Sequence, residues 1–215
     1  FVTVMVTFCV TAFGLAQVGA YPETLALFRK GFYQLISGHT GTGFMTIYAR
    51  QFNSEWSHLA LVGVACAMAL GGAVCSTTGA IKMLRIGIIL KALKEDIKKV
   101  IMPERAIVIQ KFHHIKEIFV EDKLARSALL ITVAYLILYI LGAIIGMFFG
   151  YTFLDSLFES TSAAANVGLS CGITNANMPA ALKFTYMFQM WAGRLEFMSV
   201  FTLIGFFIAA IKGKK

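Results

Sequence analysis

Four long apolar runs without a single charged residue constrain the fold of this chain more than any other feature. Each run approaches the roughly 20 residues that a helix needs to cross the hydrocarbon core of a bilayer. Only 14% of the 215 residues are charged, against roughly a quarter in an ordinary soluble domain, so we expect the surface to face lipid. The sequence therefore predicts an all-α membrane protein. The runs are residues 1–18, 59–74, 127–149 and 197–211.

The N-terminal run is interpreted as a transmembrane helix and not as a signal peptide, because it has neither a basic start nor an Ala-x-Ala cleavage site. The chain has no initiator Met and opens inside this helix. We therefore expect that the N-terminal half of the same pore is missing from it. The cysteines show no CxxC spacing, so neither a zinc site nor a disulfide framework is predicted, and no cofactor is expected.

The basic residues are distributed unevenly, and their distribution predicts the topology. Eleven of the 19 Lys and Arg lie in residues 82–126, and three more lie in residues 212–215. The positive-inside rule then places this linker and the C-terminus in the cytoplasm of a multi-pass plasma-membrane protein. Because topology explains the net charge of +8, no nucleic acid is expected as a partner.

The order of apolar runs and short connections predicts a helix, a re-entrant pore loop and a helix, twice in succession. In each half, a short pore helix and a filter loop would dip between two spanning helices. The segments are 1–56 (outward helix, pore helix and filter loop), 57–93 (broken helix with a Gly-rich gate segment), 94–125 (basic amphipathic cytoplasmic linker), 126–178 (helix, second pore helix and filter loop) and 179–215 (last helix and cytoplasmic tail).

A weak internal repeat supports this organisation. Residues 32–44 and 157–169 align without gaps at an offset of 125. Identity is confined to Ser37 with Ser162 and Gly43 with Gly168, but the pattern of a short amphipathic helix, small residues and then Gly is shared. Internal repeats of this kind are common among transporters.

The second apolar segment is too long for one crossing. Residues 56–93 number 38, which is about 57 Å of helix and far more than a bilayer spans. Gly, Ser and Thr are dense in residues 71–82, and irregular backbone at membrane depth occurs only where it is buried in protein or lines water. We predict a break there, and close helix packing through small residues remains the alternative.

The two loops have the residues that an ion filter needs. A filter replaces the hydration shell of the ion with backbone carbonyls, and small residues allow the required backbone geometry. Each loop also follows a short helix whose negative C-terminal end would point at a cation. A TGTG run also occurs in many surface turns, but two such stretches in register favour a filter. The candidate filter residues are Thr40, Gly41, Thr42, Gly43, Asn166, Val167, Gly168 and Leu169.

Arg194 lies within the last predicted helix, which runs from about residue 180 to residue 211. An arginine at the centre of a membrane costs about 2.5–3.5 kcal/mol on insertion scales, so its side chain should face a cavity or a partner. The alternative is an interfacial arginine that reaches the head groups or is paired structurally.

Four motifs resemble the C-terminal half of the Trk/Ktr/HKT superfamily of potassium transporters, and TrkH-like members in particular. They are GHTGTGF (38–44), GGAVCSTTGAIKMLR (71–85), SAAANVGLS (162–170) and WAGRLE (191–196). The resemblance implies repeats three and four of a four-repeat, pseudo-fourfold pore, with Gly43 and Gly168 as the central filter glycines. It also implies a flexible gate beneath the filter and a pore-facing arginine. The gate residues would be Gly71, Gly72, Ser76, Thr77, Thr78, Gly79 and Arg194.

The same resemblance implies potassium as the transported ion, a homodimer, and a cytoplasmic nucleotide-binding regulatory subunit of the TrkA/KtrA type. Each loop has one central Gly instead of the paired glycines of TVGYG channels. We therefore keep a sodium-permeable or poorly selective cation transporter as the alternative.

Two other classes of function share features with this sequence. Residues 168–172 match the G-x-S-x-G elbow of serine hydrolases, but that elbow needs a preceding strand and a later His base, and no His follows Ser170. An intramembrane protease is therefore disfavoured. A non-conducting membrane scaffold would have the same hydropathy, and the paired filter-like loops argue against it.

Overall fold

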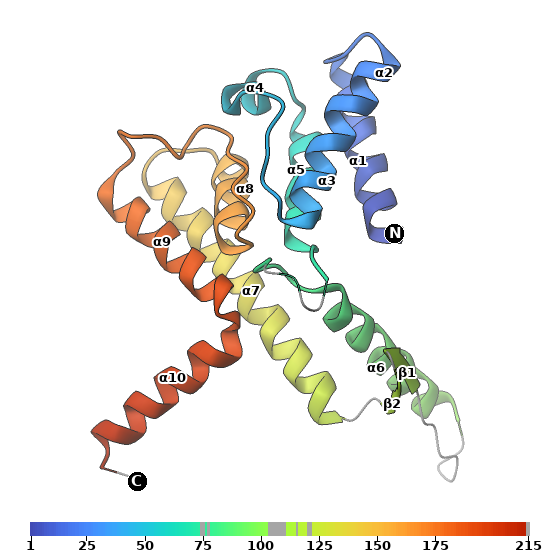
Figure 1. Cartoon of the computed structure of the whole chain (residues 1–215), viewed down its shortest axis with the longest axis vertical. Coiled ribbons are helices and arrows are strands. Elements are labelled where there is room, and N and C mark those ends of the chain that lie inside the picture. The colour runs from blue at the N-terminus through green and yellow to red at the C-terminus, as the bar shows by residue number, and fades with distance from the viewer. Residues whose placement is uncertain (74–75, 77, 103–110, 115, 120–121, 214–215) are drawn as a thin grey trace.

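The computed structural model describes residues 1–73, 76, 78–102, 111–114, 116–119 and 122–213. The chain forms two neighbouring groups of helices, one from each half of the sequence, and two helices that extend away from them at one end (Figure 1). All the elements in the described ranges are helical except one short hairpin.

The first half consists of an apolar helix and a descending helical segment beside it. The apolar helix α1 ends at Gly19, which adopts the left-handed conformation typical of a helix C-terminus. The next three elements follow one another without a break and lead back down along α1 (Figure 1). Their bounds are α1 Val2–Val18, α2 Thr24–Leu27, the π-helical turn η1 Phe28–Phe32 and α3 Tyr33–Thr40.

An extended stretch then leads back through the short helix α4 (Ala49–Ser54) to α5 (His58–Ala69). Small residues bring α5 close to α1. A Cβ atom at Gly63 would lie 2.3 Å from the hydroxyl oxygen of Thr11, and one at Gly14 would lie 2.6 Å from the backbone nitrogen of Ala60. The backbone is not helical in the described residues from 70 to 82, and α6 (Met83–Ile101) follows.

The linker contains an antiparallel hairpin that the sequence did not predict. Strands β1 (Lys111–His114) and β2 (Lys116–Phe119) pair with Lys111 opposite Phe119. Residues 111–119 mix charged, histidine and apolar residues without a clear period, so a stretch this short does not indicate a strand from its pattern. Residues 103–110, 115 and 120–121 of the predicted linker lie outside the described residues.

The second half repeats the order of a long helix, a short helix and a further helix. Its elements are α7 Asp122–Phe148, α8 Phe153–Ala164, α9 Ala180–Arg194 and α10 Glu196–Ile211. Among the described residues, α7 alone is long and apolar enough to cross a membrane as a single helix, and α9 with α10 passes the same test as a bent pair. The apolar helices α1 and α5 are shorter.

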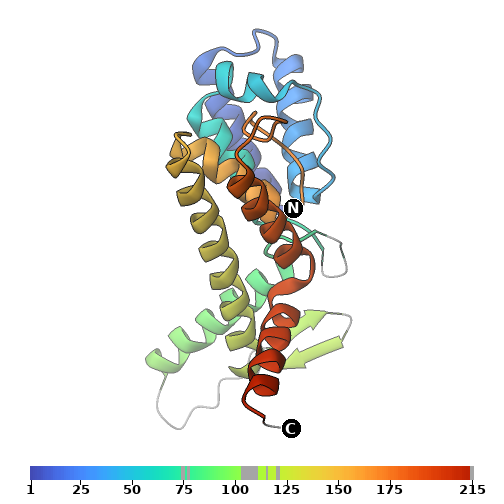
Figure 2. The same cartoon turned by 90° about the vertical axis from the view of Figure 1, so that its left-hand side faces the viewer.

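The last helix was expected to run continuously from 180 to 211, and this expectation is wrong. The chain bends by 103° between α9 and α10, so that α10 turns away from α7 below the bend (Figures 1 and 2). Glu196 adopts a φ of 54° at this point and forms ion pairs with Lys82 and Arg85. Hydrophobic periodicity continues through the bend, so the sequence pattern could not reveal it.

One core joins the two halves. The buried ring of Phe52, just after the first loop, lies 5.3 Å from that of Phe158 on α8. Val64 of α5 and Leu169 of the second loop belong to the same buried cluster. The short helix α8 therefore lies between α5 and α7, and the two loops are held next to each other.

Candidate functional site

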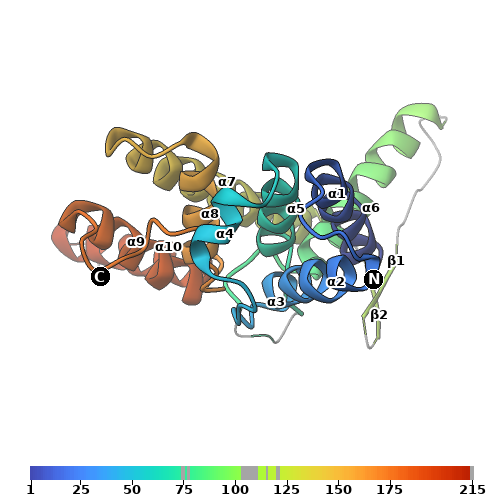
Figure 3. The same cartoon turned by 90° about the horizontal axis from the view of Figure 1, so that it is seen from above.

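The two candidate filter segments lie in direct contact. A Cβ atom at Gly43 would lie 1.8 Å from the carbonyl oxygen of Val167, a distance that no side chain can adopt. Viewed from above, α3 and α8 approach the middle of the molecule from different sides (Figure 3). Residues separated by 124 positions in the chain therefore form one site.

The loops share a hydrogen-bond pattern at the same offset of 125. In each loop a serine on the short helix accepts bonds from the two backbone N–H groups that lead into the central glycine. This fixes the turn from helix to extended chain. The bonds join Thr42 N to Ser37 O (3.0 Å), Gly43 N to Ser37 O (3.3 Å), Val167 N to Ser162 O (3.0 Å) and Gly168 N to Ser162 Oγ (3.1 Å).

Backbone dihedrals repeat in the same way. Gly41 and Asn166 occupy equivalent positions with φ values of 71° and 56°, and Gly43 and Gly168 have φ values of 78° and 97°. Asn is among the few residues other than Gly that tolerate this left-handed region. Apart from its chain neighbours, no described residue has an atom within 4 Å of a Cβ position at Gly168, so the second glycine is required by its conformation and the first also by its close neighbour.

The chain leaving each loop is held by a buried polar residue of the short helix. Gln34 of α3 is fully buried, and its side-chain amide donates to the hydroxyl of Thr46 at 2.8 Å. Glu159 of α8 is 3% exposed and accepts bonds from Cys171 N at 3.1 Å and Ile173 N at 3.2 Å. The sequence analysis did not single out Gln34 or Glu159, although the same offset of 125 aligns them.

The non-helical segment after α5 lies directly against the ends of both short helices. Gly72 N donates to His39 O at 3.1 Å, and Thr78 Oγ1 donates to Thr40 O at 3.2 Å, both at the end of α3. Gly79 N donates to Ala165 O at 2.9 Å, just beyond α8. The segment thus donates hydrogen bonds to carbonyl groups that would otherwise face the space beneath the loops.

Close contacts explain the glycines of this segment. A Cβ atom at Gly71 would lie 2.3 Å from His39 O, and one at Gly72 would lie 2.7 Å from the hydroxyl oxygen of Ser76. At Gly79 it would lie 2.5 Å from the side-chain nitrogen of Asn166. Ser76 itself donates to Ala73 O at 2.8 Å, and the predicted gate residue Thr77 lies outside the described residues.

Arg194 is the last residue of α9 and is exposed. Its neighbour Gly193 packs against the end of α8, where a Cβ atom would lie 1.9 Å from Ala164 O. Gly193 O also lies 2.8 Å from the Cβ position of Gly79. The helix end that contains Arg194 therefore meets the non-helical segment beneath the second loop.

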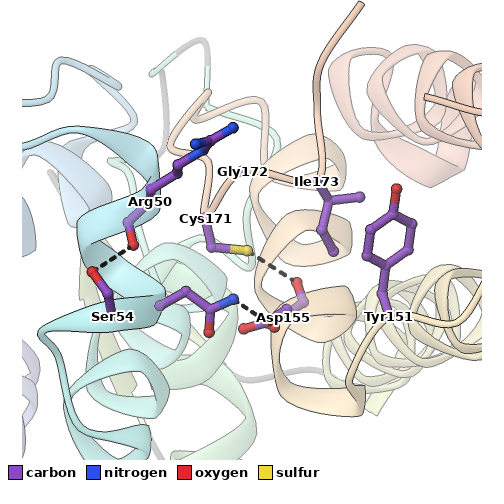
Figure 4. Close-up of a pocket in the computed structure, with 8 residues that line it drawn as sticks. Arg50, Ser54, Tyr151, Asp155, Cys171, Gly172 and Ile173 are labelled. Carbon is purple, nitrogen blue, oxygen red and sulfur yellow. Dashed lines mark hydrogen bonds between the residues drawn. The ribbon is translucent and has the colours of Figure 1, made fainter. Parts of the chain in front are cut away.

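Pockets border the second loop on two sides. One, of about 490 Å³, is lined by residues 166–170 together with side chains of α9. The other, of about 470 Å³, lies between α4 and α8 (Figure 4), where Asn53 donates to Asp155 at 3.1 Å and Arg50 lines the wall. Each pocket is lined by one acidic and one basic residue, Glu159 with Lys183 in the first and Asp155 with Arg50 in the second, and the candidate filter lines the first.

The family model TrkH, described as a cation transport protein, matches residues 1–208. The chain belongs to the TrkH family. Its relatives are integral membrane proteins that transport cations, and the resemblance predicted from the four motifs is thereby confirmed.

Individual relatives match over most of this chain. An uncharacterized cation transporter of Methanocaldococcus jannaschii is 32% identical over 80% of this chain and 35% of its own length. The Trk system potassium uptake protein TrkG of Escherichia coli is 27% identical over 92% of this chain and 40% of its own length. The chain thus spans about two fifths or less of these curated relatives.

A solved structure has the same fold. The crystal structure of the potassium transporter TrkH from Vibrio parahaemolyticus superposes with a TM-score of 0.74 at 19% identity, over 93% of this chain and 42% of that chain. The α-helical TrkH transporter fold is therefore established for this member of the family.

Proposed function

We propose that the chain forms the C-terminal half of a pore that takes up potassium across the plasma membrane. The contact between Gly43 and Val167, with the same hydrogen bonds in both loops, is the observation that supports this most strongly. It brings the backbone carbonyls of two segments together at the ends of two short helices. The negative ends of the helix dipoles favour a cation there. Backbone carbonyls then replace the hydration shell of the ion.

In this proposal the filter consists of residues 40–43 and 166–169, and the rest of the ring comes from repeats outside these 215 residues. The large exposed side chains of α7, such as Leu130, Ile137 and Phe148, would face lipid. The basic linker and the C-terminus would lie in the cytoplasm. A homodimer and a nucleotide-binding regulatory subunit of the TrkA/KtrA type complete the proposed assembly.

The non-helical segment 71–79 acts as the gate in this proposal. Its bonds to His39 O, Thr40 O and Ala165 O keep it beneath the filter. When the segment moves aside, these carbonyls become available to a hydrated cation in the space beneath the loops. Arg194, at the end of α9, adds a positive charge to the exit and slows the passing ion.

Reconstitution of the full-length protein in liposomes tests the proposal. Potassium flux should be seen, should exceed sodium flux, and should fall in the Gly43→Ser variant. Flux that does not distinguish the two ions would favour the poorly selective transporter. No flux in well-folded protein would favour the membrane scaffold.

A further inference from the structure

Glu159 is a buried carboxylate that holds the chain just after the second candidate filter segment. Its Oε1 accepts from the backbone nitrogens of Cys171, Ile173 and Thr174, at 3.1, 3.2 and 3.4 Å. The hydroxyl of Ser170 also donates to Oε1, and the hydroxyl of Thr174 donates to Oε2 at 3.0 Å. One side chain therefore collects hydrogen bonds from four of the five residues between 170 and 174.

The filter segment is thereby fixed at both ends by one helix face. Ser162, three residues after Glu159, holds the backbone nitrogens of Val167 and Gly168. Side chains three apart lie on the same face of a helix. Residues 166–169 are thus held between the hydrogen bonds to Ser162 and those to Glu159. A shift of Glu159 would therefore move the filter carbonyls.

The first loop has no equivalent charged anchor. The aligned residue is Gln34, whose amide nitrogen donates to one hydroxyl, that of Thr46, while its Oε1 is buried without a hydrogen-bond partner among the described residues. Hydrogen bonds to an ionised carboxylate are roughly twice as strong as neutral ones. The second loop is therefore held more tightly than the first.

Hydrogen bonds, and not an ion pair, satisfy the Glu159 carboxylate. Within the described ranges, the ion pairs involve other carboxylates: Glu196, Glu95 and Asp96. Lys183 lines the same pocket as Glu159, but its ammonium donates to Ala176 O at 2.9 Å. A buried negative charge next to the filter would also favour a cation in it.

We propose that Glu159 is a positioning residue for ion selection, which fixes the spacing of the second filter segment. This inference rests on the proposed filter function. A purely structural glutamate would affect the amount and stability of folded protein. A positioning glutamate also affects the ratio of potassium to sodium permeability.

The full-length protein in planar bilayers gives this ratio directly. The Glu159→Gln variant keeps the shape but replaces charge-assisted bonds with neutral ones, and the potassium-to-sodium permeability ratio should fall about fivefold. The matched control is Asp155→Asn. Asp155 is also buried on α8, but its carboxylate bonds Asn53 and Thr152, away from the filter, so its ratio should stay at the wild-type value.

An unchanged ratio in folded Glu159→Gln, together with a changed ratio in Gly168→Ser, would overturn the role of Glu159 and leave the filter proposal intact. An equal fall in Asp155→Asn would overturn it as well. If Glu159→Gln does not fold, Ser170→Ala replaces it, since this variant removes one hydroxyl bond and keeps the backbone bonds. A ratio unchanged in Ser170→Ala would then contradict the inference, and a lowered ratio would support it.

Discussion

The Cβ position of Gly43 lies 1.8 Å from the carbonyl oxygen of Val167, so the two halves of the chain meet backbone to backbone. Any side chain at position 43 must displace the second loop. At Gly168, the counterpart of Gly43, a Cβ atom would meet no described residue within 4 Å apart from its chain neighbours. The two glycines therefore differ in what they tolerate, although both have a positive φ.

Gly43→Ser and Gly168→Ser should consequently have different effects. We expect Gly43→Ser to lower both the thermal stability and the potassium flux, because its side chain collides with Val167. Gly168→Ser should remain folded, with a strain of about 1–2 kcal/mol from the left-handed backbone, and should lose selectivity. Thermal melts of the purified variants, paired with flux measurements, check this. Equal melting temperatures and wild-type flux in both variants would contradict it.

The hydrogen bond from Thr78 to Thr40 O gives a test of the gate. Thr78→Val removes this bond while conserving shape, and one such bond contributes about 0.5–1.5 kcal/mol. If the bond holds the gate closed, the open probability should rise by a few-fold up to roughly tenfold. Single-channel recording measures this probability.

Thr132→Val is the control for the gate test, because the Thr132 hydroxyl donates to Ala128 O within α7 and not to the gate segment. Its open probability should not change. If Thr78→Val conducts like the wild type or merely misfolds, the segment is a packing element of small residues, as the alternative interpretation of residues 71–82 holds.

Arg194 should raise the barrier for a passing cation. At an effective dielectric constant of about 20 and a separation of about 6 Å, the repulsion is on the order of 3 kcal/mol, comparable with the roughly 2.3 kcal/mol that 100 mV supplies per charge. Arg194→Ala should speed potassium flux, and Arg194→Lys should stay closer to the wild type. Slower flux in folded Arg194→Ala would indicate a structural role.

Glu196 lies at the bend between α9 and α10 and pairs with Lys82 and Arg85 at the start of α6. The two basic side chains are mostly buried, and the carboxylate is about one third exposed. We expect Glu196→Gln to lower the free energy of unfolding by about 1–3 kcal/mol, a value reduced for this exposure.

An ion pair within α6 provides the comparison. Lys99 pairs with Glu95 at 2.9 Å, with the lysine side chain half exposed, so solvent screens the pair and Lys99→Gln should lower the free energy of unfolding much less than Glu196→Gln does. Chemical denaturation in detergent measures both. A similar small loss in both variants would show that the bend does not need its ion pairs.

The sequence predicted what depends on composition and local pattern. Long uncharged runs located α1 and α7, and the density of Gly, Ser and Thr located the non-helical stretch before α6. The aligned glycines Gly43 and Gly168 located the two loops. These features follow from short-range physics, namely hydrophobic length and backbone freedom.

The features that the sequence left out depend on contacts between distant residues. The bend at Glu196 is set by Lys82 and Arg85, over a hundred positions away. The anchoring role of Glu159 depends on a loop that folds back onto its own helix. The offset of 125 could have revealed it, because Gln34 and Glu159 are aligned polar residues of the two short helices.

The reversal potential of the full-length protein, with potassium on one side of a planar bilayer and sodium on the other, tests the filter most directly. A filter built from residues 40–43 and 166–169 predicts a potential close to the potassium equilibrium value, and a shift toward zero in Gly168→Ser. The proposal would be contradicted by a folded Gly168→Ser variant whose reversal potential equals that of the wild type.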